Sequence, residues 1–324
     1  MKSSNIGGQA VIEGIMMKNK DDYAVAVRKP DGEIEVCVHK YKSVSPLKTV
    51  QKIPFIRGVF NFIDSLVLGM KSLNFSASFI EDEEENKNKK EITEDEQAKQ
   101  DKKDKTLMSI TMVLSVVLAI GLFMVLPYFL SSLLKGFISS RTTLTVIEGI
   151  FRFLIFIIYI MLVSRLEDIQ RTFMYHGAEH KCINCIEHGM ELNVENVQKS
   201  SKQHKRCGTS FLFFVMLVSL FFCFFITTSS PVLRVVIRIA LFPVIAGVSY
   251  EIIRFAGNSD NKFVNLLSKP GLMVQNLTTK EPDDSMVEVA IKAVEAVFDW
   301  KAYLKENFEY VEKEEAKDDI TAGL

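Results

Sequence analysis

The sequence predicts a membrane α-helical protein with a small N-terminal β domain and a C-terminal soluble helix, α+β overall. Three observations predict this class. Long apolar stretches with few or no charges recur between residues 107 and 254, and their lengths are close to what crosses a bilayer. Residues 1–50 contain short alternating and β-branched runs bounded by turn residues. Residues 284–311 repeat apolar side chains at helical spacing.

The N-terminal region, residues 1–50, is predicted to form the β domain. Its strand signals are the runs Tyr23–Arg28 and Glu33–His39, with a shorter run at Ala10–Ile12. The cluster Pro30-Asp31-Gly32 separates the two longer runs, and such clusters form tight turns. The two longer runs are therefore predicted to pair as a hairpin.

Two contrasting segments follow the β domain. Residues 51–80 are apolar, sparsely charged and rich in phenylalanine, which predicts a helix. This helix lies either in the membrane interface or in the core of the N-terminal domain, and the sequence leaves both open. Residues 81–106 are almost entirely charged or amide-bearing, without an apolar face, so they are expected to form a solvated linker or a frayed charged helix.

Residues 107–254 are predicted to form a membrane domain with about four transmembrane helices. The second predicted span contains Glu148 and Arg152, four residues apart on one helix face, where they can pair and reduce the cost of charge near lipid. Residues 255–324 are expected to form a cytoplasmic helical region that includes the amphipathic helix over 284–311. The four predicted spans cover residues 107–134, 143–164, 209–226 and 232–253.

Basic residues set the expected orientation in a bacterial plasma membrane. The loop 165–208, between the second and third spans, holds seven Lys and Arg residues, whereas the turn before the fourth span holds none. Because basic loops stay in the cytoplasm, this loop and both termini are expected inside the cell. Arg234 and Arg238 oppose this assignment, since they lie near the outer end of the fourth span.

The composition narrows the classes of function. The chain has 324 residues and a formal net charge of −1, so no overall positive field would attract nucleic acid. Its five cysteines are odd in number, and one lies within an apolar span, which argues against a disulfide framework. Reduced thiols agree with a cytoplasmic position for the loop 165–208.

The motif His176-Gly177-Ala178-Glu179-His180 is the strongest chemical signal. His176 and His180 lie four residues apart, so both imidazoles can reach one metal ion from one helix face. The pattern matches H-x-x-E-H, in which the glutamate, here Glu179, acts as general base on a metal-bound water. The alternative is that both histidines are merely polar residues at the membrane interface.

Further ligands are expected from segments that end at the same membrane boundary. His204 and Cys207 precede the third span, Glu251 lies near the end of the fourth, and Glu187 shares a helix face with His180. A mixture of nitrogen, sulfur and oxygen donors suits zinc best, although another divalent metal would also fit. Cys182 and Cys185 have C-x-x-C spacing, but no second pair accompanies them, so small packed thiols are the preferred interpretation.

Five motifs follow one another along the chain. They are Gly7–Gly14 with Met16-Met17, Tyr175–Lys181, Arg206–Phe211, Ser249-Tyr250-Glu251 and Thr278–Asp284. In this order they resemble the motifs of the bacterial YqhQ-like family, a family of unknown function numbered 1385. The resemblance covers nearly the whole chain except the charged linker. It implies a membrane protein and a metal-dependent enzyme without an assigned substrate.

Three interpretations of function remain. In the first, the chain is a zinc-dependent hydrolase at the cytoplasmic membrane interface, with Glu179 as base and a membrane-protein segment or a lipid as substrate. In the second, it is a membrane scaffold whose metal is structural or absent. A transporter is the third and least favoured, because the predicted spans show few charges and no pair of broken helices.

Overall fold

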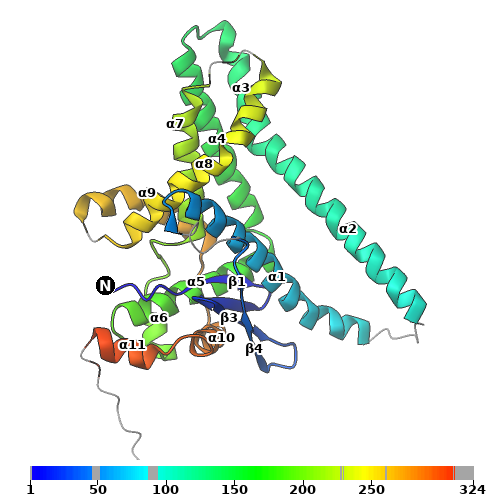
Figure 1. The fold of residues 1–324 in the computed structure, drawn as a ribbon, viewed down its shortest axis with the longest axis vertical. Coiled ribbons are helices and arrows are strands. Elements are labelled where there is room, and N and C mark those ends of the chain that lie inside the picture. Colours follow the sequence, from blue (N-terminus) through cyan, green and yellow to red (C-terminus); the bar gives the residue numbers. More distant parts are fainter. Residues whose placement is uncertain are drawn as a thin grey trace, which may run out of the picture.

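A computed structural model describes residues 2–45, 52–86, 94–226, 228, 230–259, 261–308 and 310. A column of helices stands above a lower body that combines a β-sheet with shorter helices (Figure 1). The fold is therefore mostly helical with a small N-terminal sheet, as the sequence predicts. The predicted linker 81–106 is helical at residues 81–86 and 94–106, which agrees with the charged-helix alternative, and residues 87–93 lie outside the described residues.

The sheet has four antiparallel strands in the order β1-β2-β3-β4. The predicted hairpin is confirmed, since Arg28 pairs with Ile34 across the turn. The sequence analysis missed the second strand, because its first four residues are all buried and so lack the alternation of a half-exposed strand. The strands are β1 (Gly7–Val11), β2 (Gly14–Asn19), β3 (Asp22–Arg28) and β4 (Ile34–Lys40).

Helices cover the sheet and share its hydrophobic core. The helix α5 (Glu167–Glu187) contacts β1 and β2, and α10 (Asp284–Glu295) contacts β2 and β3. The short helices α6 (Val194–Lys199) and α11 (Trp300–Asn307) complete the lower body. One core joins the sheet to α5 and α10 through fully or almost fully buried side chains, among them Ile15, Met17, Tyr175, Ile183 and Met286.

The predicted single helix over 284–311 is wrong in one respect, because the structure divides it. The helix α10 ends at its C-cap, Ala296. Asp299 is the N-cap of α11, because its carboxylate accepts a hydrogen bond from the Ala302 N–H at 2.9 Å. A carboxylate that caps a new helix N-terminus competes with continuation of the previous helix, which explains the break.

The column consists of four apolar helical segments. The helix α2 (Glu94–Ile120) continues through a π-helical turn at Gly121–Val125 into α3 (Leu126–Leu133). The chain then returns through α4 (Arg141–Val163). Two more helices, α7 (Gly208–Cys223) and α8 (Pro231–Gly257), pack against each other and complete the column.

Three helices among the described residues are long and apolar enough to cross a membrane, one fewer than expected. They are Ser109–Gly136, Arg141–Val163 and Val232–Gly257. The predicted third span, residues 209–226, is the helix α7 of 16 residues. At 1.5 Å per residue this helix is ~24 Å long, which is short of the hydrocarbon thickness of a bilayer.

Two further helices lie between the column and the lower body (Figure 1). The helix α1 (Ile56–Asn86) packs on α8, where an added Cβ at Gly58 would stand 2.7 Å from the Tyr250 side chain. It also reaches the sheet, so that Leu68 is buried beside Val11. The helix α9 (Lys262–Thr278), which the sequence analysis did not assign, packs on α7.

A buried charge cluster joins three helices of the column. The carboxylate of Glu148 on α4 pairs with Arg152 at 2.9 Å, which confirms the predicted pair. It also pairs with Arg238 on α8 at 2.6 Å. Arg152 donates a further hydrogen bond to Ser219 on α7 at 2.9 Å. All three charged side chains are buried, so one carboxylate serves two cations within the column.

The shared carboxylate predicts an order of stability among charge variants. Glu148→Gln should destabilise the protein by about 3 kcal/mol or more, because it leaves two buried guanidinium groups without a counter-charge. Arg238→Gln should cost less, since the neutral pair of Glu148 and Arg152 remains. Thermal unfolding of the purified protein in detergent measures this order, and equal losses for the two variants would contradict a shared carboxylate.

A close contact between α5 and the segment before α10 predicts that a side chain at Gly177 destabilises the fold. An added Cβ at Gly177 would stand 2.0 Å from the Lys280 carbonyl oxygen, so one backbone must move. Gly177→Ala should therefore destabilise the fold by about 1–3 kcal/mol. Gly208→Ala is the matched control, because a Cβ at this first residue of α7 meets nothing within 4 Å. Melting temperatures compare the two, and an equal response would argue against the close contact.

Candidate metal centre

Three potential metal ligands meet where α5 approaches the start of α7. They are His176, His180 and Cys207, and each offers one ligand atom within 4.8 Å of the other two. The Cys207 Sγ lies 3.3 Å from the His176 Nε2. Two donors on one tetrahedral zinc ion stand ~3.5 Å apart for a nitrogen and a sulfur ligand, so this spacing suits a shared ion.

Backbone carbonyl groups orient both imidazole rings. The His176 Nδ1 lies 2.9 Å from the Thr278 carbonyl oxygen, and the His180 Nδ1 lies 2.7 Å from the Lys202 carbonyl oxygen. A carbonyl oxygen only accepts, so each Nδ1 must carry the proton and each Nε2 keeps a free lone pair. This arrangement, in which the second ring nitrogen is anchored, is typical of histidine ligands to metals.

Cys207 is held at the N-terminus of α7. It is the N-cap residue, and its Sγ accepts a hydrogen bond from the Thr209 N–H at 3.3 Å. The partial positive charge of a helix N-terminus favours a negatively charged ligand at this position. The spacing of 27 residues between His180 and Cys207 in the sequence gives no indication of this contact, which arises because the loop 200–207 returns along α5.

Glu179, the predicted base, lies on α5 beside the histidines and faces the sheet. Its side chain is buried, and its carboxylate accepts a hydrogen bond from the Gly8 N–H on β1. Burial raises the pKa of this carboxyl group, while the neighbouring His176 and the Gly8 hydrogen bond act in the opposite direction. An added Cβ at Gly8 would stand 2.7 Å from the Met16 carbonyl oxygen and 3.0 Å from the Glu179 Cγ, so the strand approaches both groups most closely with a glycine.

His204 and Glu187 lie next to the three ligands but form a separate polar network. The His204 Nε2 is 3.4 Å from the Glu187 Oε2. Glu187 is completely buried and also pairs with Arg206. Its Oε1 further accepts hydrogen bonds from the Ser4 N–H at 2.7 Å and the Ser4 hydroxyl at 2.8 Å. Among the described residues, neither side chain belongs to the group that could hold an ion.

This network contains one ionised carboxylate and one neutral ring. Burial alone would raise the pKa of Glu187, but the hydrogen bond with His204, the charge of Arg206 and the Ser4 N–H together lower it to about 2. Burial lowers the pKa of His204 to about 4, in spite of the hydrogen bond with Glu187. The arrangement is that of a structural anchor which fixes the N-terminal segment and the loop 200–207 to the end of α5.

Glu251 lies apart from the ligand group. Its carboxylate accepts a hydrogen bond from the Arg57 Nε at 2.7 Å and another from the Phe55 N–H at 3.2 Å. The ion pair joins the start of α1 to the lower end of α8. The structure thus brings together three of the six residues expected as metal ligands, namely His176, His180 and Cys207, and puts Glu251 into a contact between helices.

Several residues that support the centre were missed by the sequence analysis. Gln275 on α9 is fully buried and bonds to the backbone of His204 on both sides, through its Oε1 at 3.0 Å and its Nε2 at 2.8 Å. Thr278 supplies the carbonyl group that orients His176. The signal for Thr278 was present, since it begins one of the motifs shared with the YqhQ-like family, but a backbone carbonyl has no sequence signature of its own.

The C-x-x-C pair has a structural role. Cys182 and Cys185 are fully buried members of the core that joins α5 to the sheet. Burial raises the pKa of Cys182 well above its ordinary value and that of Cys185 to about 12, so both stay thiols. The prediction of small packed thiols is confirmed.

Comparisons with known proteins agree with the resemblance found in the motifs. The family described as "Protein of unknown function (DUF1385)" matches residues 53–300. The protein named "Uncharacterized protein YqhQ" from Bacillus subtilis (strain 168) is 37% identical over 308 residues, which cover 93% of this chain and 94% of that protein. No solved structure matches. The chain is a member of the YqhQ-like DUF1385 family.

Proposed function

We propose that this chain is a multi-pass protein of the bacterial plasma membrane with a zinc centre at its cytoplasmic boundary, where it hydrolyses a membrane-protein segment or a lipid. The observation that supports a metal centre is the convergence of His176, His180 and Cys207, with both imidazole rings oriented by backbone carbonyl groups. The proposal has three parts, which are insertion in the membrane, the position of the centre and its chemistry.

Exposed apolar surface supports insertion in the membrane. Within the span Ser109–Gly136, the most apolar 18-residue window has no buried residue, although its mean hydropathy is 2.6. In Figure 1, α2 stands apart from the other helices of the column. An apolar helix exposed to water on all sides would be unstable, whereas the hydrocarbon core of a bilayer would surround the same side chains favourably.

The position of α1 and α9 supports a centre at the membrane boundary. Both helices lie between the column and the polar lower body, and both expose large apolar side chains. Such helices are typical of the interfacial layer of a bilayer. Cys207, the N-cap of α7, and Thr278, the last residue of α9, both contact His176, so the ligand group adjoins the end of α9. The exposed side chains include Ile56, Leu66 and Met70 on α1 and Phe263, Leu266 and Met273 on α9.

The donor set supports zinc as the ion, although another divalent metal would also fit. Two imidazole nitrogens and one thiolate are common zinc ligands, and three protein donors leave one tetrahedral position for water or substrate. Zinc, when bound, supplies a Lewis acid that activates water near neutral pH. Glu179 lies beside the ligands, so it is the group that would accept the proton released by water in hydrolysis.

A second candidate is a non-enzymatic scaffold with a structural metal. The contact of Glu179 with the Gly8 N–H favours it, because a carboxylate that anchors β1 has a structural task. In this case the same three ligands would fasten α5 to the start of α7, and the lower body would present a surface to cytoplasmic partners. Substitution of Glu179 separates the two candidates.

If the metal centre is present, substitution of a ligand and substitution of the base should affect the metal content differently. His176→Ala, His180→Ala or Cys207→Ser should lower the metal content from about one ion per chain to a small fraction, because two remaining donors hold zinc weakly. Glu179→Gln should keep the metal. Elemental analysis of protein purified without chelators measures this, beside the melting temperature after zinc is added.

Cys182→Ser is the matched control, since this cysteine lies on the same helix in the core and outside the ligand group. Wild-type protein without stoichiometric metal, and without stabilisation by zinc, would overturn the metal centre. Complementation of a deletion strain tests the reaction. Full function of Glu179→Gln would exclude catalysis by this motif and leave the scaffold.

The orientation is tested by labelling from outside the cell. A single cysteine at Ser201, which is exposed in the loop 165–208, should remain unmodified by a membrane-impermeant thiol reagent in whole cells. The same cysteine should react once the cells are lysed, which controls for access. Labelling in intact cells would reverse the orientation and move the centre to the outer face.

A further inference from the structure

The far end of the helix column contains a pocket of about 260 Å³. Its lining residues come from the end of α3 and the turn after it, the start of α4 and the start of α8. This end of the column is remote from the sheet (Figure 1). The proposed hydrolytic function does not use it. Nine residues line the pocket, of which Lys135, Arg141 and Arg234 are basic and Glu148 alone is acidic.

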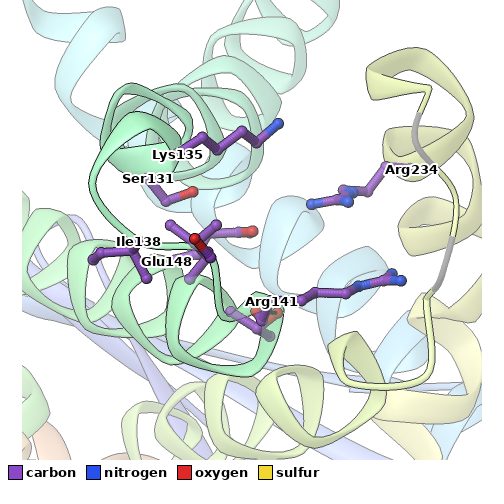
Figure 2. Close-up of a pocket in the computed structure, with 9 residues that line it drawn as sticks. Ser131, Lys135, Ile138, Arg141, Glu148 and Arg234 are labelled. Carbon is purple, nitrogen blue, oxygen red and sulfur yellow. Dashed lines mark hydrogen bonds between the residues drawn. The ribbon is translucent and has the colours of Figure 1, made fainter.

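The pocket has a surplus of positive charge. Its one carboxylate, Glu148, is already paired with two buried cations, Arg152 at 2.9 Å and Arg238 at 2.6 Å. The described lining holds no second carboxylate near Lys135 and Arg234. In Figure 2, Arg234 extends its guanidinium group from α8 toward the side of the pocket formed by Ser131 and Glu148.

One aromatic ring holds two of these cations in place. The Arg234 guanidinium carbon lies 4.7 Å from the centre of the Tyr128 ring, and the Lys135 Nζ lies 5.4 Å from it. Arg234 also donates a hydrogen bond from its Nη2 to the Thr228 carbonyl oxygen at 3.0 Å. Two like charges on one ring repel each other, so an anion between them would stabilise the arrangement.

Buried donors provide a second, independent observation. The Nε of Arg234, the arginine that reaches into the pocket, is buried without a hydrogen-bond acceptor. Guanidinium groups are buried in this way where their positive charge is balanced nearby, and their planar fork matches the oxygens of a phosphate group. The free Arg234 Nε and the basic lining together fit an oxyanion.

We propose that this pocket binds a phosphate group, and that its source is the headgroup of an anionic phospholipid. The volume exceeds the share of liquid volume of a single water molecule several-fold, so a substituted phosphate has room. Exposed apolar side chains on the neighbouring turns offer a surface to acyl chains; they are Leu133, Phe137, Val232 and Leu233. In the proposed orientation this end of the column faces outward, where the positive-inside rule disfavours basic residues. An anionic headgroup would explain why Arg234 lies there.

The experiment measures lipid binding to the full chain in detergent by native mass spectrometry. Phosphatidylglycerol should bind the wild type in preference to zwitterionic phosphatidylcholine. Arg234→Gln and Lys135→Gln should each reduce binding of phosphatidylglycerol by about tenfold, because each removes a charge-assisted contact with the phosphate. Arg165→Gln is the matched control, since it removes an exposed cation just beyond the other end of α4 and should leave binding unchanged.

Inorganic phosphate distinguishes the two sources of the ligand. Weak competition by millimolar phosphate supports a lipid headgroup. If free phosphate displaces phosphatidylglycerol and stabilises the wild type but not Arg234→Gln, the pocket binds a soluble anion and the lipid source is overturned. Equal retention of phosphatidylglycerol by the wild type, Lys135→Gln and Arg234→Gln would overturn the site itself. The exposed position of Lys135 makes its variant informative even if Arg234→Gln does not fold.

Discussion

The close contact between α5 and the segment 278–283 is the constraint on which the lower half of the molecule depends. Gly177 lets the Lys280 carbonyl oxygen approach the helix, and the Lys280 N–H donates to the Phe173 carbonyl oxygen at 2.9 Å. This fixes Thr278 where its carbonyl group orients His176. Asp283 then caps α10, which closes the core over the sheet. Without a glycine in α5, both the ligand geometry and the core would be displaced.

The two ends of the molecule differ in how their buried carboxylates, Glu187 and Glu148, are compensated. At the lower end, Glu187 is ionised and surrounded by donors from Arg206 and Ser4, so the negative charge is fully satisfied. At the far end, Glu148 is shared by two arginines, and further cations line the adjacent pocket. The first arrangement is closed and structural. The second has positive charge in surplus, which is why it suits an external anion.

Much of the fold could be predicted because it depends on local patterns. The hairpin of β3 and β4 follows from strand runs around Pro30-Asp31-Gly32, and the pair of Glu148 and Arg152 follows from helical spacing. The strand β2 was missed since it is buried on both faces. The span expected at residues 209–226 proved too short, because α7 ends at Cys223. Element ends depend on caps and tertiary contacts that hydropathy does not encode.

The sequence by itself determined the helical class, the apolar spans and the pair of histidines on one helix face, since each depends on residues close together in the chain. Only the tertiary structure decided which distant groups join them. Cys207 reaches the histidines because α7 begins next to α5, whereas Glu251 pairs with Arg57 on α1. The carbonyl groups of Lys202 and Thr278 orient the rings, and a backbone carbonyl is identical in every residue. Such contacts arise only from the path of the folded chain.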